Sequence, residues 1–135
     1  APPDLIIVQN WNYANKNNKK ISYLAAVEIK SPVLDPIYNK EYKNGEYKSH
    51  TLKEVSHHLD VIPKVILTDC IRWQFFQRKS GTDSIKIIDL LSINKKESNK
   101  SVKENRVLME QLQLEEDEPE EWKDLCSYMY EFITE

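Results

Sequence analysis

The chain has 135 residues, of which 40% are hydrophobic and 30% charged, and these values predict one folded domain with a highly charged surface. Its formal net charge of −3 provides no overall attraction to nucleic acid, although lysines are frequent over 16–53 and residues 115–121 are almost entirely acidic. Only two glycines occur, Gly45 and Gly81, which excludes the glycine-rich phosphate loops of P-loop and dinucleotide-binding proteins.

The two cysteines, Cys70 and Cys126, lie far apart and outside any CxxC pair, so we expect reduced thiols in the core rather than zinc ligands. No segment approaches the roughly 20 apolar residues needed to span a bilayer, and no signal peptide is recognisable. We therefore expect a cytoplasmic protein without membrane contact. Because the first residue is not methionine, we also expect that the chain can be a fragment of a larger protein.

The first predicted element is a strand over residues 4–8, a run rich in β-branched residues that follows two prolines. Residues 10–20 are rich in Asn and Lys and predict a long hairpin loop. A second strand is predicted over 21–30, since it is apolar at nearly every position, as in strands buried on both faces. Residues 31–48 are then expected to form an irregular loop.

A helix is predicted over residues 49–61, because Leu52, Val55 and Leu59 recur at helical spacing and Pro63 follows its end. Alternating and apolar runs predict further strands, with turns between them: strands over 64–69, 72–77 and 85–91, a tight turn at Cys70–Ile71 and a second turn at 80–83.

The lysine-rich residues 94–105 are expected to form a mobile loop, and the chain is expected to end in an amphipathic helix over 118–134 with Pro119 in its first turn. The predicted apolar stripe of that helix comprises Trp122, Leu125, Cys126, Met129, Phe132 and Ile133. Together these elements predict a single α/β domain over 1–135, with a mixed β-sheet flanked by helices.

The pattern with most chemical content is Asp4, followed twenty-four residues later by Glu28-Ile29-Lys30. Alternate residues of a strand share a face, so Glu28 and Lys30 point the same way. If the first two strands pair as a hairpin, Asp4 lies beside Glu28, and two ionised carboxylates side by side repel each other. Mg²⁺, or Mn²⁺ in its place, relieves that repulsion and also binds phosphate. Lys30 supplies a positive charge next to a bound water.

Pro3-Asp4 followed by Glu28-Ile29-Lys30-Ser31-Pro32, then a helix and two further strands, resembles the PD-(D/E)XK nuclease superfamily, in particular the nuclease domains of type I and related restriction–modification enzymes. The resemblance covers residues 3–77. It implies a restriction-endonuclease-like fold and a Mg²⁺-dependent DNA endonuclease, a hydrolase that acts as the cleavage module of such an enzyme. It further implies DNA as partner, together with fused or associated methyltransferase, helicase or specificity modules.

The resemblance also assigns roles to single residues. Asp4, Glu28 and Lys30 would be catalytic, and the metal ligands would be the carboxylates of Asp4 and Glu28 with the carbonyl of Ile29.

Two features depart from the family's pattern. The family usually begins with a helix that contributes an acidic residue, followed by a strand, and neither fits before Asp4 here. Related nucleases often carry Gln and Tyr four residues apart on the helix after the lysine strand, where this chain has Glu54 and His58. We expect these two as auxiliary residues near the site. The departures keep an alternative open, a non-catalytic DNA-binding or protein-interaction module that retains the nuclease fold.

Aromatic and basic residues of the first loop are candidate DNA contacts, namely Trp11, Lys16, Lys19 and Lys20. Trp11 and Tyr13 can stack on bases, but packing within the hairpin explains them equally well. Other chemically notable side chains have plainer explanations. Adjacent residues on a helix point in different directions, so we expect His57 and His58 on the surface rather than as joint metal ligands. We expect Trp73, Phe75 and Phe76 in the core.

Overall fold

A computed structural model of the chain describes residues 2–14, 21–32, 34, 50–90, 106–107, 110, 118 and 120–135. Most of the loop predicted over 31–48, the whole of 94–105, and Lys16, Lys19, Lys20 and Pro119 therefore lie outside the described residues. The described strands are β1 (Leu5–Gln9), β2 (Ser22–Ile29), β3 (Lys64–Thr68), β4 (Arg72–Gln77) and β5 (Lys86–Asp89), with helices α2 (His50–Val61) and α4 (Glu120–Thr134) and a short 3-10 turn at Arg78–Ser80.

The five strands form one mixed sheet in the order β1-β2-β3-β4-β5. Neighbouring pairs are antiparallel except β2 and β3, which are parallel. A parallel pair needs a connection that returns the chain to the same end of the sheet, and α2 lies within that connection. The predicted α/β class, a mixed sheet flanked by helices, is confirmed, with strand and helix ends within two residues of those expected.

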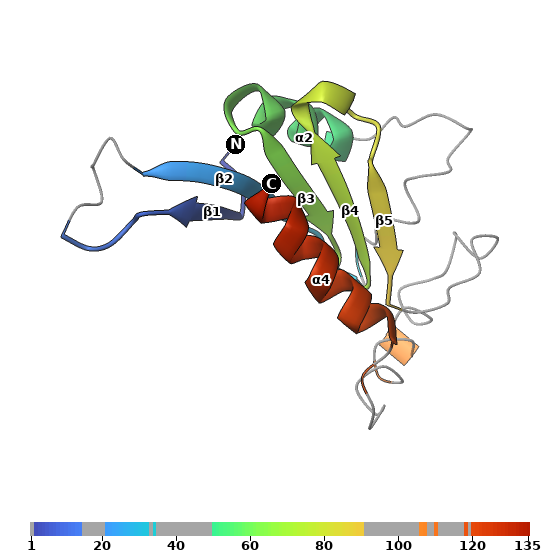
Figure 1. Cartoon of the computed structure of the whole chain (residues 1–135). Helices are drawn as coiled ribbons and strands as arrows, with labels where there is room; N and C mark the ends of the chain where they lie inside the picture. The colour runs from blue at the N-terminus through green and yellow to red at the C-terminus, as the bar shows by residue number, and fades with distance from the viewer. Residues whose placement is uncertain are drawn as a thin grey trace.

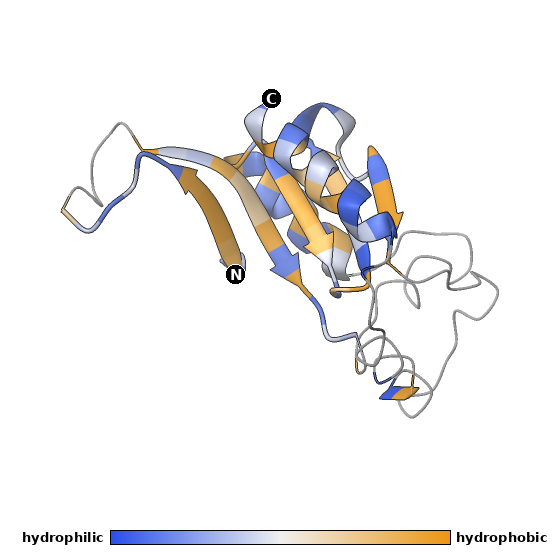
Figure 2. Ribbon diagram, turned by 60° about the horizontal axis from the view of Figure 1, so that its bottom comes forward, coloured by the Kyte–Doolittle hydropathy of each residue, from blue (hydrophilic) through white to orange (hydrophobic). Residues whose placement is uncertain are grey.

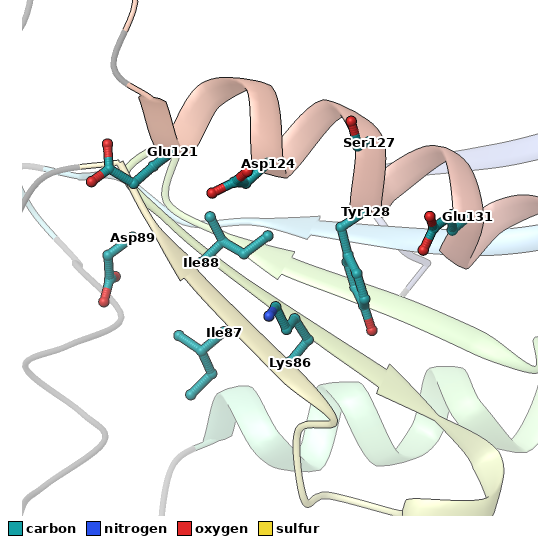
Figure 3. Close-up of a pocket in the computed structure, with 9 residues that line it drawn as sticks. All are labelled: Lys86, Ile87, Ile88, Asp89, Glu121, Asp124, Ser127, Tyr128 and Glu131. Carbon is teal, nitrogen blue, oxygen red and sulfur yellow. The ribbon is translucent and has the colours of Figure 1, made fainter.

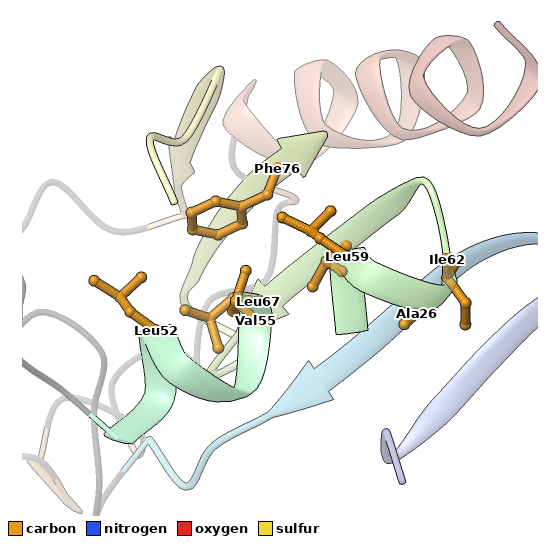
Figure 4. Packing of buried hydrophobic residues seen from close by; sticks show 8 residues of the cluster. Ala26, Leu52, Val55, Leu59, Ile62, Leu67 and Phe76 are labelled. Atoms are coloured by element: carbon orange, nitrogen blue, oxygen red, sulfur yellow. The ribbon is translucent and has the colours of Figure 1, made fainter. Parts of the chain in front are cut away.

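The two helices cover opposite faces of the sheet, so that α4 crosses in front of the strands and α2 lies behind them in Figure 1. Figure 4 shows the α2 side, where apolar side chains of the helix pack on alternate residues of three strands. The members of this cluster are Ala26, Leu52, Val55, Leu59, Ile62, Val65, Leu67 and Phe76. The intervening strand residues pack against α4, and this second cluster comprises Val27, Ile66, Phe75, Ile88, Leu90, Leu125 and Phe132.

This alternation fixes which face each polar strand residue occupies. Ala26 belongs to the α2 cluster and Val27 to the α4 cluster. Since side chains alternate along a strand, Glu28 lies on the α2 face. The prediction that Phe75 and Phe76 are core residues is confirmed, while Trp73 packs against the α4 cluster and is half-buried.

The prediction of two buried thiols is wrong, because Cys70 and Cys126 are both exposed. Cys70 lies in the turn after β3, outside the strands that form the core, and has a φ of 73°. On α4, Leu125 and Phe132 form the buried stripe, and Cys126 follows Leu125 by about 100° around the helix, which takes it off that stripe. Trp122, also predicted on the stripe, is 39% exposed.

No helix in the described part of the chain is both long and apolar enough to cross a membrane.

Candidate functional site

The pairing of β1 with β2 brings Asp4 next to Glu28. Leu5 is opposite Val27 in the antiparallel register, so the preceding residue, Asp4, faces Glu28 across the strands. The Asp4 Oδ2 accepts a hydrogen bond of 2.8 Å from the backbone N–H of Ile29. Residues opposite each other in an antiparallel pair project from the same face. Both carboxylates therefore project from the same face of the hairpin, at the end where β1 begins and β2 ends, as the sequence pattern predicted.

Glu28 is buried, and its principal partner comes from α2. Only 6% of its side chain is exposed, and its Oε1 lies 3.0 Å from Nε2 of His58. The imidazole is equally buried, so the expectation of a surface histidine is wrong for His58. It holds for His57, the next residue back along the helix, which is exposed. The difference arises because a carboxylate on β2, thirty residues earlier, lies under one face of the helix.

Lys30 lies between two carboxylates at the end of β2. Its Nζ is 3.2 Å and 3.4 Å from the two carboxylate oxygens of Glu54 and 3.5 Å from Oε2 of Glu28. Its backbone N–H donates to the carbonyl of Thr68 at 2.8 Å, which anchors the residue beyond the end of the strand. Glu54 and His58 are one helical turn apart, so α2 presents both predicted auxiliary residues to the same place.

Burial and neighbouring charges change the acid–base behaviour of this group. The pKa of Glu28 is raised, chiefly by burial and further by the carboxyl groups of Glu54 and Asp4, although the hydrogen bond from His58 acts in the opposite direction. For Lys30, burial lowers the pKa, but contacts with Glu54 and Glu28 outweigh it, so the pKa is raised overall. Two carboxyl groups thus contact the Lys30 ammonium, and a third, that of Asp4, adds negative charge next to Glu28.

The donor set fits a magnesium ion held by two carboxylates rather than an enclosing protein cage. Within the described residues, no group of three or more His, Cys, Asp or Glu side chains is arranged to hold a metal ion. Mg²⁺ commonly binds proteins through one or two carboxylates and completes its coordination with waters and substrate phosphates. Asp4 and Glu28 are carboxylates of this kind, on neighbouring strands. The carbonyl of Ile29 as a third ligand stays a prediction.

Among the buried polar residues on this face that the sequence analysis did not single out are Gln74 and Thr51. Gln74 is opposite Leu67 on β3, which is itself opposite Glu28, so the three residues form one row across the sheet. The available signal was a polar residue between aromatic ones at an inward-facing position of β4. Thr51 lies in the first turn of α2 and is 3% exposed.

A cleft of about 440 Å³ lies between β5 and α4 (Figure 3). The α4 helix packs on the sheet face opposite the one that carries Glu28. Its polar lining is largely acidic, with Asp89, Glu121, Asp124 and Glu131 and a single lysine, Lys86, whose Nζ lies 5.8 Å from the Tyr128 ring centroid. Carboxylates repel phosphate, so this cleft is a poor place for a nucleic-acid backbone.

Trp11 is exposed at the hairpin tip, whereas Lys16, Lys19 and Lys20 lie outside the described residues. Comparisons with models of known protein families, with curated proteins and with solved structures found no match for this chain.

Proposed function

We propose that this chain is a Mg²⁺-dependent DNA endonuclease domain of the PD-(D/E)XK type and the cleavage module of a restriction–modification enzyme. The observation that carries the proposal is the Asp4 carboxylate, held by the Ile29 N–H opposite a buried Glu28, with the Lys30 ammonium 3.5 Å from Glu28. The family resemblance assigns catalysis to an acidic residue on one strand and to an acidic residue and a lysine on the strand paired with it, here Asp4, Glu28 and Lys30. A cytoplasmic location, where the DNA substrate is found, belongs to the same proposal.

The roles of the side chains follow from their chemistry. Asp4 and Glu28 would hold the ion, and Mg²⁺ when bound supplies Lewis-acid polarisation of a phosphodiester oxygen. Lys30 would place its positive charge where negative charge develops on the phosphate and would orient the attacking water. Glu54 holds the Lys30 ammonium through two oxygens. His58 holds the Glu28 carboxylate on the side away from Lys30.

Nicking of supercoiled plasmid DNA tests this proposal. We expect the protein to nick plasmid in Mg²⁺ or Mn²⁺ and not in excess EDTA. Lys30→Ala and Glu28→Ala should each lower the rate by at least about 100-fold, since the first removes the positive charge beside the developing negative charge and the second removes a carboxylate that would hold the ion. Lys79→Ala and Glu120→Ala serve as matched controls at exposed positions remote from the site. Equal nicking in excess EDTA, or wild-type rates in Lys30→Ala, would show that the proposal is wrong.

One observation favours the alternative of a non-catalytic module with the same fold. Glu28 is paired with His58, and Lys30 with Glu54, so these four side chains already satisfy one another without an ion. Calorimetric titration with Mn²⁺ separates the two readings. Binding that is lost in both Asp4→Asn and Glu28→Gln supports the nuclease, whereas no heat of binding to the wild type supports the non-catalytic module.

A further inference from the structure

Two aromatic side chains are exposed where β1 ends. Trp11 is 48% and Tyr13 85% exposed, and their ring centroids are 5.8 Å apart with an interplanar angle of 59°. The rings therefore contact each other while leaving much of their surface to solvent. Figures 1 and 2 show that the β1–β2 hairpin extends away from both helices, so no other described element covers this tip.

The chain around these aromatics is basic, in contrast with the protein as a whole. Residues 9–22 contain Lys16, Lys19 and Lys20 and no acidic residue, whereas the complete chain has a net charge of −3. Exposed aromatic rings followed closely by lysines match a nucleic-acid strand, because bases stack on the rings and phosphates attract the ammonium groups. An apolar protein surface would require no such charge.

The hairpin also connects this tip to the candidate catalytic site. Asp4 and Glu28 lie at one end of the paired strands, and Trp11 lies beyond the other end. Trp11 is seven positions after Asp4, and the five residues of β1 between them extend over roughly 17 Å at the rise of about 3.3 Å per residue in a strand. A strand of about five nucleotides spans that length at about 3.4 Å per nucleotide.

We propose that Trp11 and Tyr13 stack on unpaired bases, so that the chain at the end of β1 binds a single-stranded segment of nucleic acid, with the positive net charge of residues 9–22 adding attraction to its phosphates. Stacking requires bases that are free of their own partners, which selects single-stranded over fully paired substrate. The link to the carboxylates rests on the proposed function, whereas binding at the tip does not.

Fluorescence anisotropy with a labelled oligo(dT) of about 20 nucleotides, in EDTA, tests the proposal. We expect Trp11→Ala and Tyr13→Ala each to weaken binding by about 5- to 150-fold, the range measured for the loss of one stacked base, and Trp11→Phe to retain most of it. Trp122→Ala and Tyr130→Ala are the matched controls, since these aromatics are 39% and 71% exposed on α4. Thermal unfolding of every variant verifies that it is folded.

Three results would overturn the inference: no oligonucleotide binding by the wild-type protein, equal losses in the hairpin and α4 variants, or equal affinity for a blunt duplex. Because the measurement contains no metal, it is independent of cleavage. Binding through the hairpin without metal-dependent nicking would support this inference and contradict the proposed nuclease. Cleavage of single-stranded and duplex DNA that is unaffected by Trp11→Ala would support the nuclease and contradict the link between the hairpin and the carboxylates.

Discussion

At the scale of single residues, Glu28 has the least ordinary surroundings among the described carboxylates of the site. It is 5% exposed, faces Asp4 across the hairpin and contacts both His58 and Lys30. Burial without compensation would make an ionised carboxylate very costly, so its neighbours decide whether it carries charge. The pKa of Glu28 is raised because burial and the adjacent carboxyl groups outweigh the hydrogen bond from His58.

This raised pKa predicts a pH dependence of stability. Below the ordinary value of 4.5, Glu28 is protonated in both the folded and the unfolded chain and contributes no difference. As the pH rises from 4.5 through the raised pKa of the folded state, the unfolded chain loses its proton first and becomes favoured. We therefore expect the free energy of unfolding of the wild type to fall relative to Glu28→Gln across that window.

Urea unfolding in EDTA, followed by tryptophan fluorescence at stepped pH, measures this difference. Glu120→Gln on the exposed start of α4 provides the control, whose difference from the wild type should not follow the same pH window. A difference between Glu28→Gln and wild type that is constant with pH, or that grows in favour of the wild type, would contradict the prediction.

At the scale of elements, α2 serves both the core and the candidate site. Leu52, Val55 and Leu59 pack on the sheet, while Glu54 and His58 project beside them toward the end of β2. Periodicity alone predicted this helix, because its apolar residues recur at helical spacing. Periodicity did not predict the burial of His58, since its partner belongs to a strand far away in the sequence.

The turn between β3 and β4 depends on one buried carboxylate. Asp69 is 0% exposed, and its Oδ1 accepts hydrogen bonds from the backbone N–H groups of Ile71 at 3.0 Å and Arg72 at 2.7 Å. Thr68 supports the same turn, because its hydroxyl accepts from the N–H of Cys70 and donates to the carbonyl of Arg72. These bonds hold Cys70 at a positive φ that few non-glycine residues adopt.

Asp69→Ala should lower the free energy of unfolding by about 2–4 kcal/mol, since it leaves two buried N–H donors without their acceptor. Asp69→Asn keeps a side-chain oxygen at this position and should cost clearly less. Chemical denaturation of both variants measures the effect. Equal destabilisation by alanine and asparagine would show that charge, rather than the two hydrogen bonds, is what the turn requires.

At the scale of the whole molecule, the sheet separates the face that carries the candidate site from the face that α4 covers. The carboxylates and Lys30 lie with α2 on one side, and α4 packs on the other through rings that meet edge to face. Phe132 contacts Phe75 at a centroid distance of 5.1 Å, and Lys64 donates to its carbonyl while lying 5.4 Å from its ring centroid.

Phe132→Ala should therefore destabilise the protein without changing the site. Truncation of a buried phenylalanine costs about 3–5 kcal/mol, whereas Tyr130→Ala, at a position 71% exposed on the same helix, should change stability by less than about 0.5 kcal/mol. Thermal and urea unfolding measure both. If Phe132→Ala is too unstable to purify, Phe132→Leu should show a smaller loss of stability, because it also removes the buried aromatic ring but leaves a large apolar side chain. If the folded Phe132 variant binds Mn²⁺ with an affinity very different from that of the wild type, the two faces of the sheet are not independent.

Local patterns in the sequence determined most of the elements and the order of the chemical groups. Apolar runs and helical spacing located β1 to β5, α2 and α4, and the strand period placed Glu28 and Lys30 on one side. These predictions succeeded because each depends on residues that are neighbours along the chain. The failure at Cys126 has the same basis, since a small apolar residue one position from a buried stripe gives no local sign of its exposure.

Only the tertiary structure decided which distant groups meet. The sequence predicted Asp4 beside Glu28 only if the first two strands pair, and the structure supplies that register together with the helix that brings Glu54 to Lys30 and His58 to Glu28. A side chain's burial and pKa depend on all atoms around it, and residues that are adjacent only in space supply most of those atoms. The charge state of the candidate site is therefore a property of the fold.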